Sequence, residues 1–210
     1  EKTIEGGLTL GGPNMLEAEL ASLMCARFPS LERVRFCNSG TEANLYAISA
    51  ARMTTGRSAV MVMNGAYHGG VFYFGEKKPP TNAPFPYVIA RYNDIETTVG
   101  LVEKHAHELA AIVIEPMIAS GGIAADKEFL VALREAATKH GIVLIFDEVM
   151  TSRLSPGGLQ AATGVTPDMT SFGKYLGGGM SFGASRLAGR HHGAVRSDAA
   201  QFGGAFGYVQ

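Results

Sequence analysis

The sequence has 210 residues, of which 46% are hydrophobic and 9% aromatic, enough to bury a core of ordinary size. Eighteen Lys and Arg against nineteen Asp and Glu give a net charge of -1, and no basic run is present, so nucleic acid and anionic membranes are disfavoured as partners. The longest apolar stretches, such as 141–146, are too short to span a bilayer, and residues 1–13 lack the pattern of a signal peptide. We therefore expect a cytoplasmic protein with a small-molecule ligand.

Short β-branched runs alternate with amphipathic helical patterns along the chain. This alternation is typical of βαβ units and predicts an α/β fold with a largely parallel central sheet and flanking helices. The expected strands are 34–37, 59–63, 87–90, 111–114, 142–146, 169–172 and 182–187. The expected helices follow Pro13 and occupy 41–55, 93–107 and 126–140, while the Pro-rich stretch 79–86 predicts a surface loop.

Two cysteines and the chain ends carry further expectations. Cys25 and Cys37 have no partner motif, so we interpret them as reduced core residues. The sequence begins without Met in a Gly-rich stretch and stops at 206–210 without a helix stop signal or a polar tail. We therefore expect it to be a piece of a longer protein.

Distinctive polar residues follow five of the expected strands. In open α/β sheets, ligands bind beyond the carboxyl ends of the strands, where loops converge and helix N-termini point inward. The segments at these ends are 38–42 (NSGTE), 64–69 (NGAYHG), 115–116 (EP), 147–149 (DEV) and 173–174 (GK). They supply an anion-binding turn, an aromatic ring, acidic groups and an amine, so we expect them to form one site.

The segment Ser39-Gly40-Thr41 opens an expected helix. Free N–H groups and the positive end of a helix dipole suit a phosphate, and Gly40 lets the backbone approach it closely. Taken alone, such a segment is more often an ordinary helix cap than an anion site, so the motif by itself is weak evidence for phosphate binding.

Asp147 follows five apolar residues, so we expect its carboxylate to be partly buried and to need a cationic partner. A protonated pyridine nitrogen is such a partner, since a carboxylate that holds it makes the ring an electron sink. The alternative is an ordinary ion pair with Arg153 or the cap of a turn.

Three further residues offer cofactor chemistry. Tyr67, in a Gly-flanked turn, could lay its ring on a flat cofactor, and His68 could form a hydrogen bond beside it. Lys174 lies between Gly173 and the glycines 177–179, an apolar and flexible setting that favours imine chemistry. Taken singly, Tyr67 and His68 could be packing residues, and Lys174 could be a solvated surface lysine.

Together these motifs resemble the class III aminotransferases and glutamate-1-semialdehyde aminomutases, which are pyridoxal-5'-phosphate (PLP) enzymes of fold type I. The resemblance runs from 11–13 (GGP) to the glycines after Lys174, nearly the whole chain. Its most specific motifs, in family order, are 38–44 (NSGTEAN), 67–69 (YHG), 146–149 (FDEV) and 171–174 (SFGK). The stretch 147–154 (DEVMTSRL) is most similar to β-amino-acid transaminases, including those acting on β-phenylalanine.

The resemblance implies how PLP would be held. Ser39, Gly40 and Thr41 would bind the phosphate, Tyr67 would stack on one face of the pyridine ring, and Val149 would pack on the other face. No metal is expected.

The resemblance also implies the chemistry. Lys174 would form the Schiff base with PLP, and Asp147 would pair with the ring nitrogen. Glu115 would have a supporting role near the cofactor, and His68 is counted with the cofactor-binding residues for its hydrogen bond beside the ring.

The resemblance has two departures, and the first is at Ala205. Family members usually have Gly-Thr-Phe where this sequence has 204–206 (GAF), and that threonine reaches the phosphate of the neighbouring subunit in a homodimer. Because Ala205 has no hydroxyl, one phosphate contact would be missing. The family also continues into a small C-terminal domain. Residues 1–210 are therefore expected to be a piece of the PLP-binding large domain, without the small domain.

The expected reaction is transamination between an amino donor, possibly a β-amino acid, and an oxo-acid acceptor. The substrate amine would displace Lys174 from the Schiff base, and the freed lysine amine would then move a proton between the substrate carbon and the cofactor C4'. Two alternatives stay open: an aminomutase of the glutamate-1-semialdehyde type, which would use the same groups, and a non-catalytic truncated fragment. A nucleotide-binding βαβ domain is disfavoured because no Gly-x-Gly-x-x-Gly or Walker pattern follows the first strand.

Overall fold

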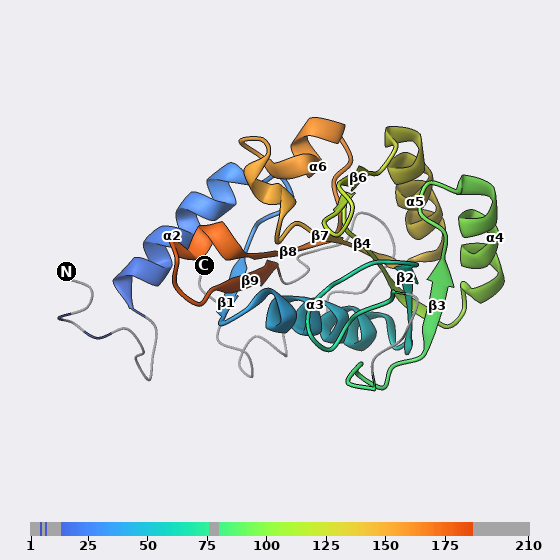
Figure 1. Cartoon of the computed structure of the whole chain (residues 1–210), viewed down its shortest axis with the longest axis horizontal. Helices are drawn as coiled ribbons and strands as arrows, with labels where there is room; N and C mark the ends of the chain where they lie inside the picture. Colours follow the sequence, from blue (N-terminus) through green and yellow to red (C-terminus); the bar gives the residue numbers. More distant parts are fainter. Residues whose placement is uncertain (1–4, 6, 8–13, 76–79, 187–210) are drawn as a thin grey trace.

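A seven-stranded sheet forms the centre of the protein (Figure 1). The computed structural model describes residues 5, 7, 14–75 and 80–186. The sheet has the strand order β1-β9-β8-β7-β4-β2-β3. Its strands are β1 (Val34–Cys37), β2 (Ala59–Met63), β3 (Tyr87–Ala90), β4 (Leu109–Ile114), β7 (Val143–Asp147), β8 (Met169–Gly173) and β9 (Gly183–Arg186).

The sheet is largely parallel, as predicted. Strands β8, β7, β4, β2 and β3 pair in parallel, while β9 is antiparallel to both of its neighbours, β8 and β1. Parallel strands share one carboxyl edge, so the loops that follow them emerge together. Because β9 runs the other way, its first residue, Gly183, pairs with Gly173, the last residue of β8.

Helices cover both faces of the sheet. The longer helices are α2 (Met15–Arg27), α3 (Gly40–Thr55), α4 (Ile95–His105) and α5 (Lys127–His140). Side chains alternate along β4: Ala111 and Val113 pack toward α3, whereas Ile112 and Ile114 pack toward α4 and α5. This two-sided burial explains why the central strands are continuous apolar runs without polar alternation.

A third apolar cluster lies at the β1 edge of the sheet. There α2 packs against β1, β8 and β9, with Phe28 of the segment after α2 in ring contact with Phe172 at 4.5 Å between centroids. None of the described helices combines the length and apolarity needed to cross a bilayer.

The helix ends follow the predicted signals. The Ser39 hydroxyl accepts a hydrogen bond from the backbone N–H of Glu42 at 3.2 Å, which caps α3. Gly56 and Gly141 end α3 and α5 with φ of 68° and 61°, a left-handed conformation that glycine adopts without strain. Asp94 caps α4, as expected.

Several boundaries and short elements differ from the expectations. Helix α4 ends at His105, not at 107, and β4 begins at Leu109, two residues before the expected start. Elements too short for a clear periodicity were not predicted; they are β5 (Met117–Ile118), β6 (Ile123–Ala124), α6 (Gly158–Thr163), and the 3-10 turns η1 (Thr151–Arg153) and η2 (Lys174–Gly177). Cys25 and Cys37 are free thiols, as expected, but both are only partly buried and not part of the fully buried core.

Candidate active site

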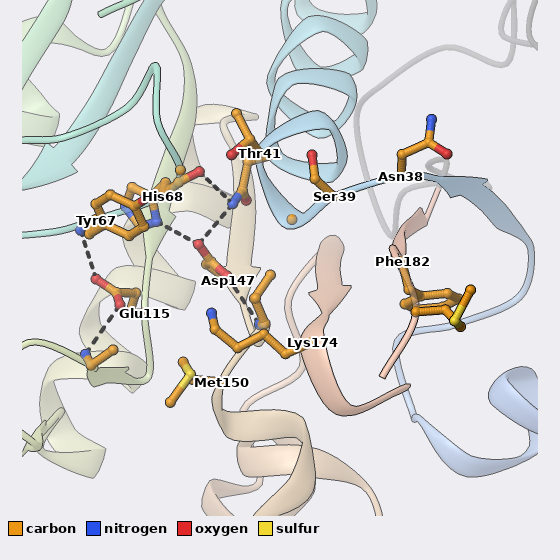
Figure 2. Close-up of a pocket in the computed structure, with 16 residues that line it drawn as sticks. Asn38, Ser39, Thr41, Tyr67, His68, Glu115, Asp147, Met150, Lys174 and Phe182 are labelled. Carbon is orange, nitrogen blue, oxygen red and sulfur yellow. Dashed lines mark hydrogen bonds and ion pairs between the residues drawn. The ribbon is translucent and has the colours of Figure 1, made fainter. Parts of the chain in front are cut away.

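A cavity of about 280 Å3 lies where the carboxyl ends of the parallel strands meet. Its walls come from the loops after β1, β2, β4, β7 and β8 and from the residue before β9 (Figure 2). All nine residues singled out from the sequence line it: Ser39, Gly40, Thr41, Tyr67, His68, Glu115, Asp147, Val149 and Lys174. The five strand ends therefore border one cavity, as expected, and the roles of the nine residues stay predictions.

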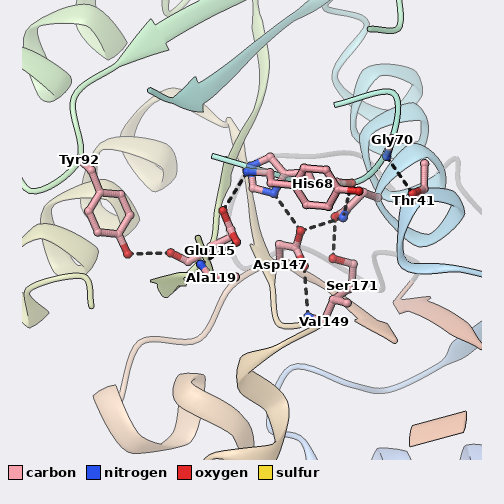
Figure 3. A network of polar contacts seen from close by, with 11 residues as sticks. Thr41, His68, Gly70, Tyr92, Glu115, Ala119, Asp147, Val149 and Ser171 are labelled. Atoms are coloured by element: carbon pink, nitrogen blue, oxygen red, sulfur yellow. Dashed lines mark hydrogen bonds and ion pairs between the residues drawn. The ribbon is translucent and has the colours of Figure 1, made fainter. Parts of the chain in front are cut away.

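Asp147, at the end of β7, is 5% exposed and accepts hydrogen bonds on both carboxylate oxygens (Figure 3). Its Oδ2 lies 2.8 Å from Asn44 Nδ2 and 2.8 Å from His68 Nδ1, and its Oδ1 accepts from the backbone N–H of Val149 at 3.1 Å. The alternative ion pair with Arg153 does not form, because that guanidinium lies over the ring of Tyr175 instead. Within the described part of the chain, Asp147 has no Lys or Arg partner.

His68 is buried beside Asp147 and contacts it through one ring nitrogen. A carboxylate only accepts hydrogen bonds, so His68 Nδ1 must donate to Asp147 Oδ2. The other nitrogen, Nε2, is buried and has no hydrogen-bond partner among the described residues. The imidazole thus fixes the carboxylate on one side and leaves one polar atom unpaired beside the cavity.

Glu115, after β4, ties two loops of the site together. Its Oε2 accepts from the backbone N–H of Tyr67 at 3.1 Å, and its Oε1 accepts from that of Ala119 at 3.2 Å (Figure 3). Burial raises the pKa of Glu115, and the neighbouring Asp147 carboxylate adds to the rise, while His68 opposes it. Glu115 therefore holds the Tyr67 turn in place and also lines the cavity itself.

Tyr67 and Val149 approach the cavity from different elements. The Tyr67 ring is 49% exposed and lies 6.0 Å from the ring of Tyr73, centroid to centroid, so it is available for a ligand. Val149 packs tightly on Gly40: a Cβ added there would lie 2.8 Å from Val149 Cγ2. Any larger side chain at position 40 would therefore have to displace Val149 or the start of α3.

The first turn of α3 faces the cavity with Ser39, Gly40 and Thr41. The first N–H groups of a helix lack an intrahelical acceptor, and this end of the helix dipole is positive. Thr41 Oγ1 also accepts from the backbone N–H of Gly70 at 3.2 Å, which joins this turn to the loop after β2. The arrangement provides N–H groups and hydroxyls suited to an anion.

Lys174 begins η2 directly after β8, with φ of 51°, an uncommon value for a residue with a side chain. Figure 2 shows it below Asp147, on the same cavity as Tyr67 and Met150. The apolar setting expected for Lys174 is not found, since the residue is exposed in the described part of the chain.

Some lining residues were missed by the sequence analysis. Asn44 belongs to a quoted motif but received no role, although its position three residues after Thr41 on α3 places both on one helix face. Met150, Met180 and Phe182 form apolar walls, and no local pattern marks them. The segments 11–13 and 204–206, with Ala205, lie outside the described residues. No three His, Cys, Asp or Glu side chains within residues 14–75 and 80–186 are grouped so as to hold a metal ion.

The model of one protein family, aminotransferase class-III, matches residues 11–207. The chain belongs to this family. This class III aminotransferase chain is 52% identical over 184 residues to the β-phenylalanine transaminase of Variovorax paradoxus. The matched region covers 87% of this chain and 42% of that relative. It is 44% identical over 202 residues to the glutamate-1-semialdehyde 2,1-aminomutase of Chlorobaculum tepidum. Here the matched region covers 89% of this chain and 46% of the relative. The chain thus spans less than half the length of these relatives.

Solved structures agree with the family and with the predicted fold type. The β-phenylalanine aminotransferase of Variovorax paradoxus superposes with a TM-score of 0.84 at 46% identity, over 98% of this chain and 49% of the other. A transaminase solved with PLP bound superposes with a TM-score of 0.80 at 33% identity, over 89% of this chain and 47% of the other.

Proposed function

We propose that this class III aminotransferase chain is the PLP-binding part of an enzyme that transfers the amino group of an amino acid or amine to an oxo acid. The observation that carries the proposal is one cavity bordered by a buried carboxylate, an amine and a helix N-terminus. The Variovorax relative, which by its name acts on β-phenylalanine, makes a β-amino acid the candidate donor. Because the chain spans about half of such proteins, the reaction is proposed for the whole protein.

The residues fit PLP by their chemistry. Asp147 is a buried carboxylate beside a cavity, without a Lys or Arg partner in the described ranges, and a protonated ring nitrogen would neutralise it. The start of α3 suits the phosphate, and Lys174 provides an amine for the aldehyde. A related transaminase with PLP bound supports the same cofactor here.

The roles of the holding residues follow from their positions. Ser39, Gly40 and Thr41 would bind the phosphate through first-turn N–H groups and hydroxyls. Tyr67 and Val149, which approach from the loops after β2 and β7, would pack on the two faces of the ring.

Bound PLP supplies a ring that takes up the electron pair released at the substrate carbon. Asp147 would accept a hydrogen bond from the ring N–H and so would keep that nitrogen protonated. Lys174 Nζ would take the proton from the amine-bearing carbon of the substrate, hold it as an ammonium group and give it back later in the reaction. His68 and Glu115 keep Asp147 and the Tyr67 turn in place, while Met150 and Phe182 provide apolar walls of the cavity.

An aminomutase is the second candidate, supported by the 44% identity to the Chlorobaculum tepidum aminomutase. It would use the same residues but return the amine to a neighbouring carbon of one substrate. The two reactions differ in one requirement, since a transaminase needs an oxo acid as a second substrate. An assay of the full-length protein with 15N-labelled donor, with and without an oxo acid, separates them by where the label appears.

We also propose a homodimer in the cytoplasm for the whole protein, following the family resemblance. Sedimentation of the full-length protein tests the dimer, and fractionation of the source cells tests the location.

Lys174 is the residue that tests the cofactor proposal. Addition of PLP to the chain should give a visible absorbance band, and borohydride reduction followed by peptide mapping should place the pyridoxyl group on Lys174. Lys174→Ala should abolish the band, whereas Lys104→Ala, which changes an exposed lysine on α4, should keep it. Labelling of another lysine, or a chain that folds but gives no band, would refute the assignment; the second result favours the non-catalytic fragment.

A further inference from the structure

Asn44 lies behind Asp147 and is 1% exposed. Its Nδ2 donates to Asp147 Oδ2 at 2.8 Å and to the backbone carbonyl of His68 at 3.0 Å. Its Oδ1 accepts from the hydroxyl of Ser171 at 2.6 Å, within the network shown in Figure 3. One side chain thus links α3, the turn after β2, the end of β7 and β8.

These three neighbours determine the orientation of the Asn44 amide. The Asp147 carboxylate and the His68 carbonyl only accept hydrogen bonds, so both N–H groups of the amide must point to them. A flipped amide would set Oδ1 against the carboxylate. The Ser171 hydroxyl, which is fully buried, donates to Oδ1 and so favours the observed orientation.

The resulting pattern leaves one acceptor position on Asp147. An ionised carboxylate has about four lone-pair positions, two on each oxygen. Among the residues that the structure describes, Oδ2 receives two donors, Asn44 Nδ2 and His68 Nδ1, whereas Oδ1 receives only the backbone N–H of Val149. The remaining position therefore belongs to Oδ1.

We infer that Asn44 and Ser171 are positioning residues that reserve Oδ1 of Asp147 for the protonated ring nitrogen of the cofactor. The inference rests on the proposed function for the identity of that cation. Without the Ser171 hydroxyl, nothing holds the Asn44 amide in its orientation except its two acceptors. Oδ2 then loses one of its two donors, Asn44 Nδ2, for part of the time, the carboxylate gains freedom to turn, and the ring N–H is bound less firmly.

A matched pair of serine variants tests the inference. Ser171→Ala removes the 2.6 Å hydroxyl bond to Asn44, while Ser30→Ala removes the 2.7 Å hydroxyl bond to Thr170, the preceding residue of β8. Both hydroxyls are buried and each substitution deletes a single oxygen atom. The two variants should therefore lose similar amounts of thermal stability, but only Ser171 contacts the Asp147 network.

Two measurements on the PLP-loaded chain report the positioning. The 15N chemical shift of PLP labelled at the ring nitrogen reports whether that nitrogen carries a proton, and absorbance titration gives the dissociation constant. Ser30→Ala should match the wild type in both. Ser171→Ala should show reduced ring protonation and a dissociation constant raised roughly three- to tenfold, as expected for one weakened hydrogen bond.

A third measurement needs no cofactor. In the free chain, the side-chain amide protons of Asn44 should exchange slowly with solvent in the wild type and in Ser30→Ala, and faster in Ser171→Ala. Equal exchange in all three proteins, or equal ring protonation in both variants, overturns the inference. Failure of the wild type to bind PLP overturns the proposed function and with it the ring nitrogen as the partner of Oδ1. If Ser171→Ala does not fold, Ser171→Cys, with a weak S–H donor, takes its place.

Discussion

Glu148 is a fully buried carboxylate whose hydrogen bonds all come from the segment that follows it. Its Oε1 accepts from the backbone N–H and the side-chain amide of Gln160, at 3.1 and 3.0 Å. Its Oε2 accepts from the backbone N–H of Leu159 at 2.7 Å and from the hydroxyl of Thr151 at 3.0 Å. Glu148, which stands between Asp147 and Val149 in the sequence, therefore fixes η1 and the start of α6 next to these two site residues.

The substitution Glu148→Gln keeps the shape but replaces one accepting oxygen by an NH2 group. If Oε1 keeps both bonds to Gln160, the new NH2 group faces Thr151 and Leu159. The Thr151 hydroxyl can rotate and accept, but the Leu159 N–H becomes an unpaired buried donor. Such a donor costs about 1–3 kcal/mol of unfolding free energy, which corresponds to roughly 2–12 °C in Tm for a chain of this size.

Urea and thermal unfolding of the chain measure this loss. Glu135→Gln on α5 is the control, because Glu135 is exposed and surface changes usually stay within about 0.5 kcal/mol. Glu148→Ala should be more destabilising than Glu148→Gln, since it leaves all four donors without their acceptor. If Glu148→Gln is as stable as Glu135→Gln, then the carboxylate does not hold this segment and the reasoning fails.

Three further outcomes are expected. Gly69→Ala should lower the free energy of unfolding by about 2–4 kcal/mol, because φ is +119° and the new Cβ would lie 2.2 Å from Thr41 Oγ1. Gly65→Ala is the control, since φ is +84° but nothing lies within 4 Å of the new Cβ. In the same urea titration it should show only the smaller loss that comes from backbone strain. Burial raises the pKa of Glu115 above its ordinary 4.5, so the folded chain favours the neutral carboxyl more than the unfolded chain does. Protonated Glu115 therefore contributes its full stability below pH 4.5, and this contribution is lost as the pH rises through the higher pKa of the folded chain. The stability of the wild type relative to Glu115→Gln should accordingly fall over that window, and a difference independent of pH would contradict the burial argument. Burial also raises the pKa of Cys37 from 9.0 to about 11, so a smaller fraction of this thiol is ionised in the folded chain. Its alkylation by iodoacetamide at pH 8 should therefore be roughly a hundredfold slower in the folded chain than in urea. Comparable rates would show that the pKa of Cys37 is not raised by folding.

Much of the sheet and of the site was predictable because the signals are local. The central strands are unbroken apolar runs, and polar residues at the carboxyl ends of parallel strands must converge. The burial of Asp147 followed from the strand before it. The family resemblance then connected Lys174 and Tyr67 to one cofactor.

Other features depend on contacts between distant segments, which local patterns do not encode. Asn44 and Ser171 are 127 positions apart, yet they share a hydrogen bond that forms only when α3 lies across β8. Glu148 directly follows Asp147, and its separate role became visible only when its partners in α6 were known. The exposure of Lys174 likewise depends on which segments pack beside η2, a property that its glycine neighbours do not determine.

The connection between β8 and β9 is closed at its base, where Gly173 pairs with Gly183. Lys174, Met180 and Phe182 all belong to this single excursion of the chain. The entropy of closing a loop grows only slowly with its length, by roughly 0.6 kcal/mol for each doubling, so insertions here would disturb the fold little. An insertion after η2 would nevertheless move the apolar wall of Met180 and Phe182, while Lys174 would stay next to Gly173, the last residue of β8. Loop length at this point therefore offers evolution, and protein engineers, a way to reshape one wall of the cavity while the rest of the sheet stays unchanged.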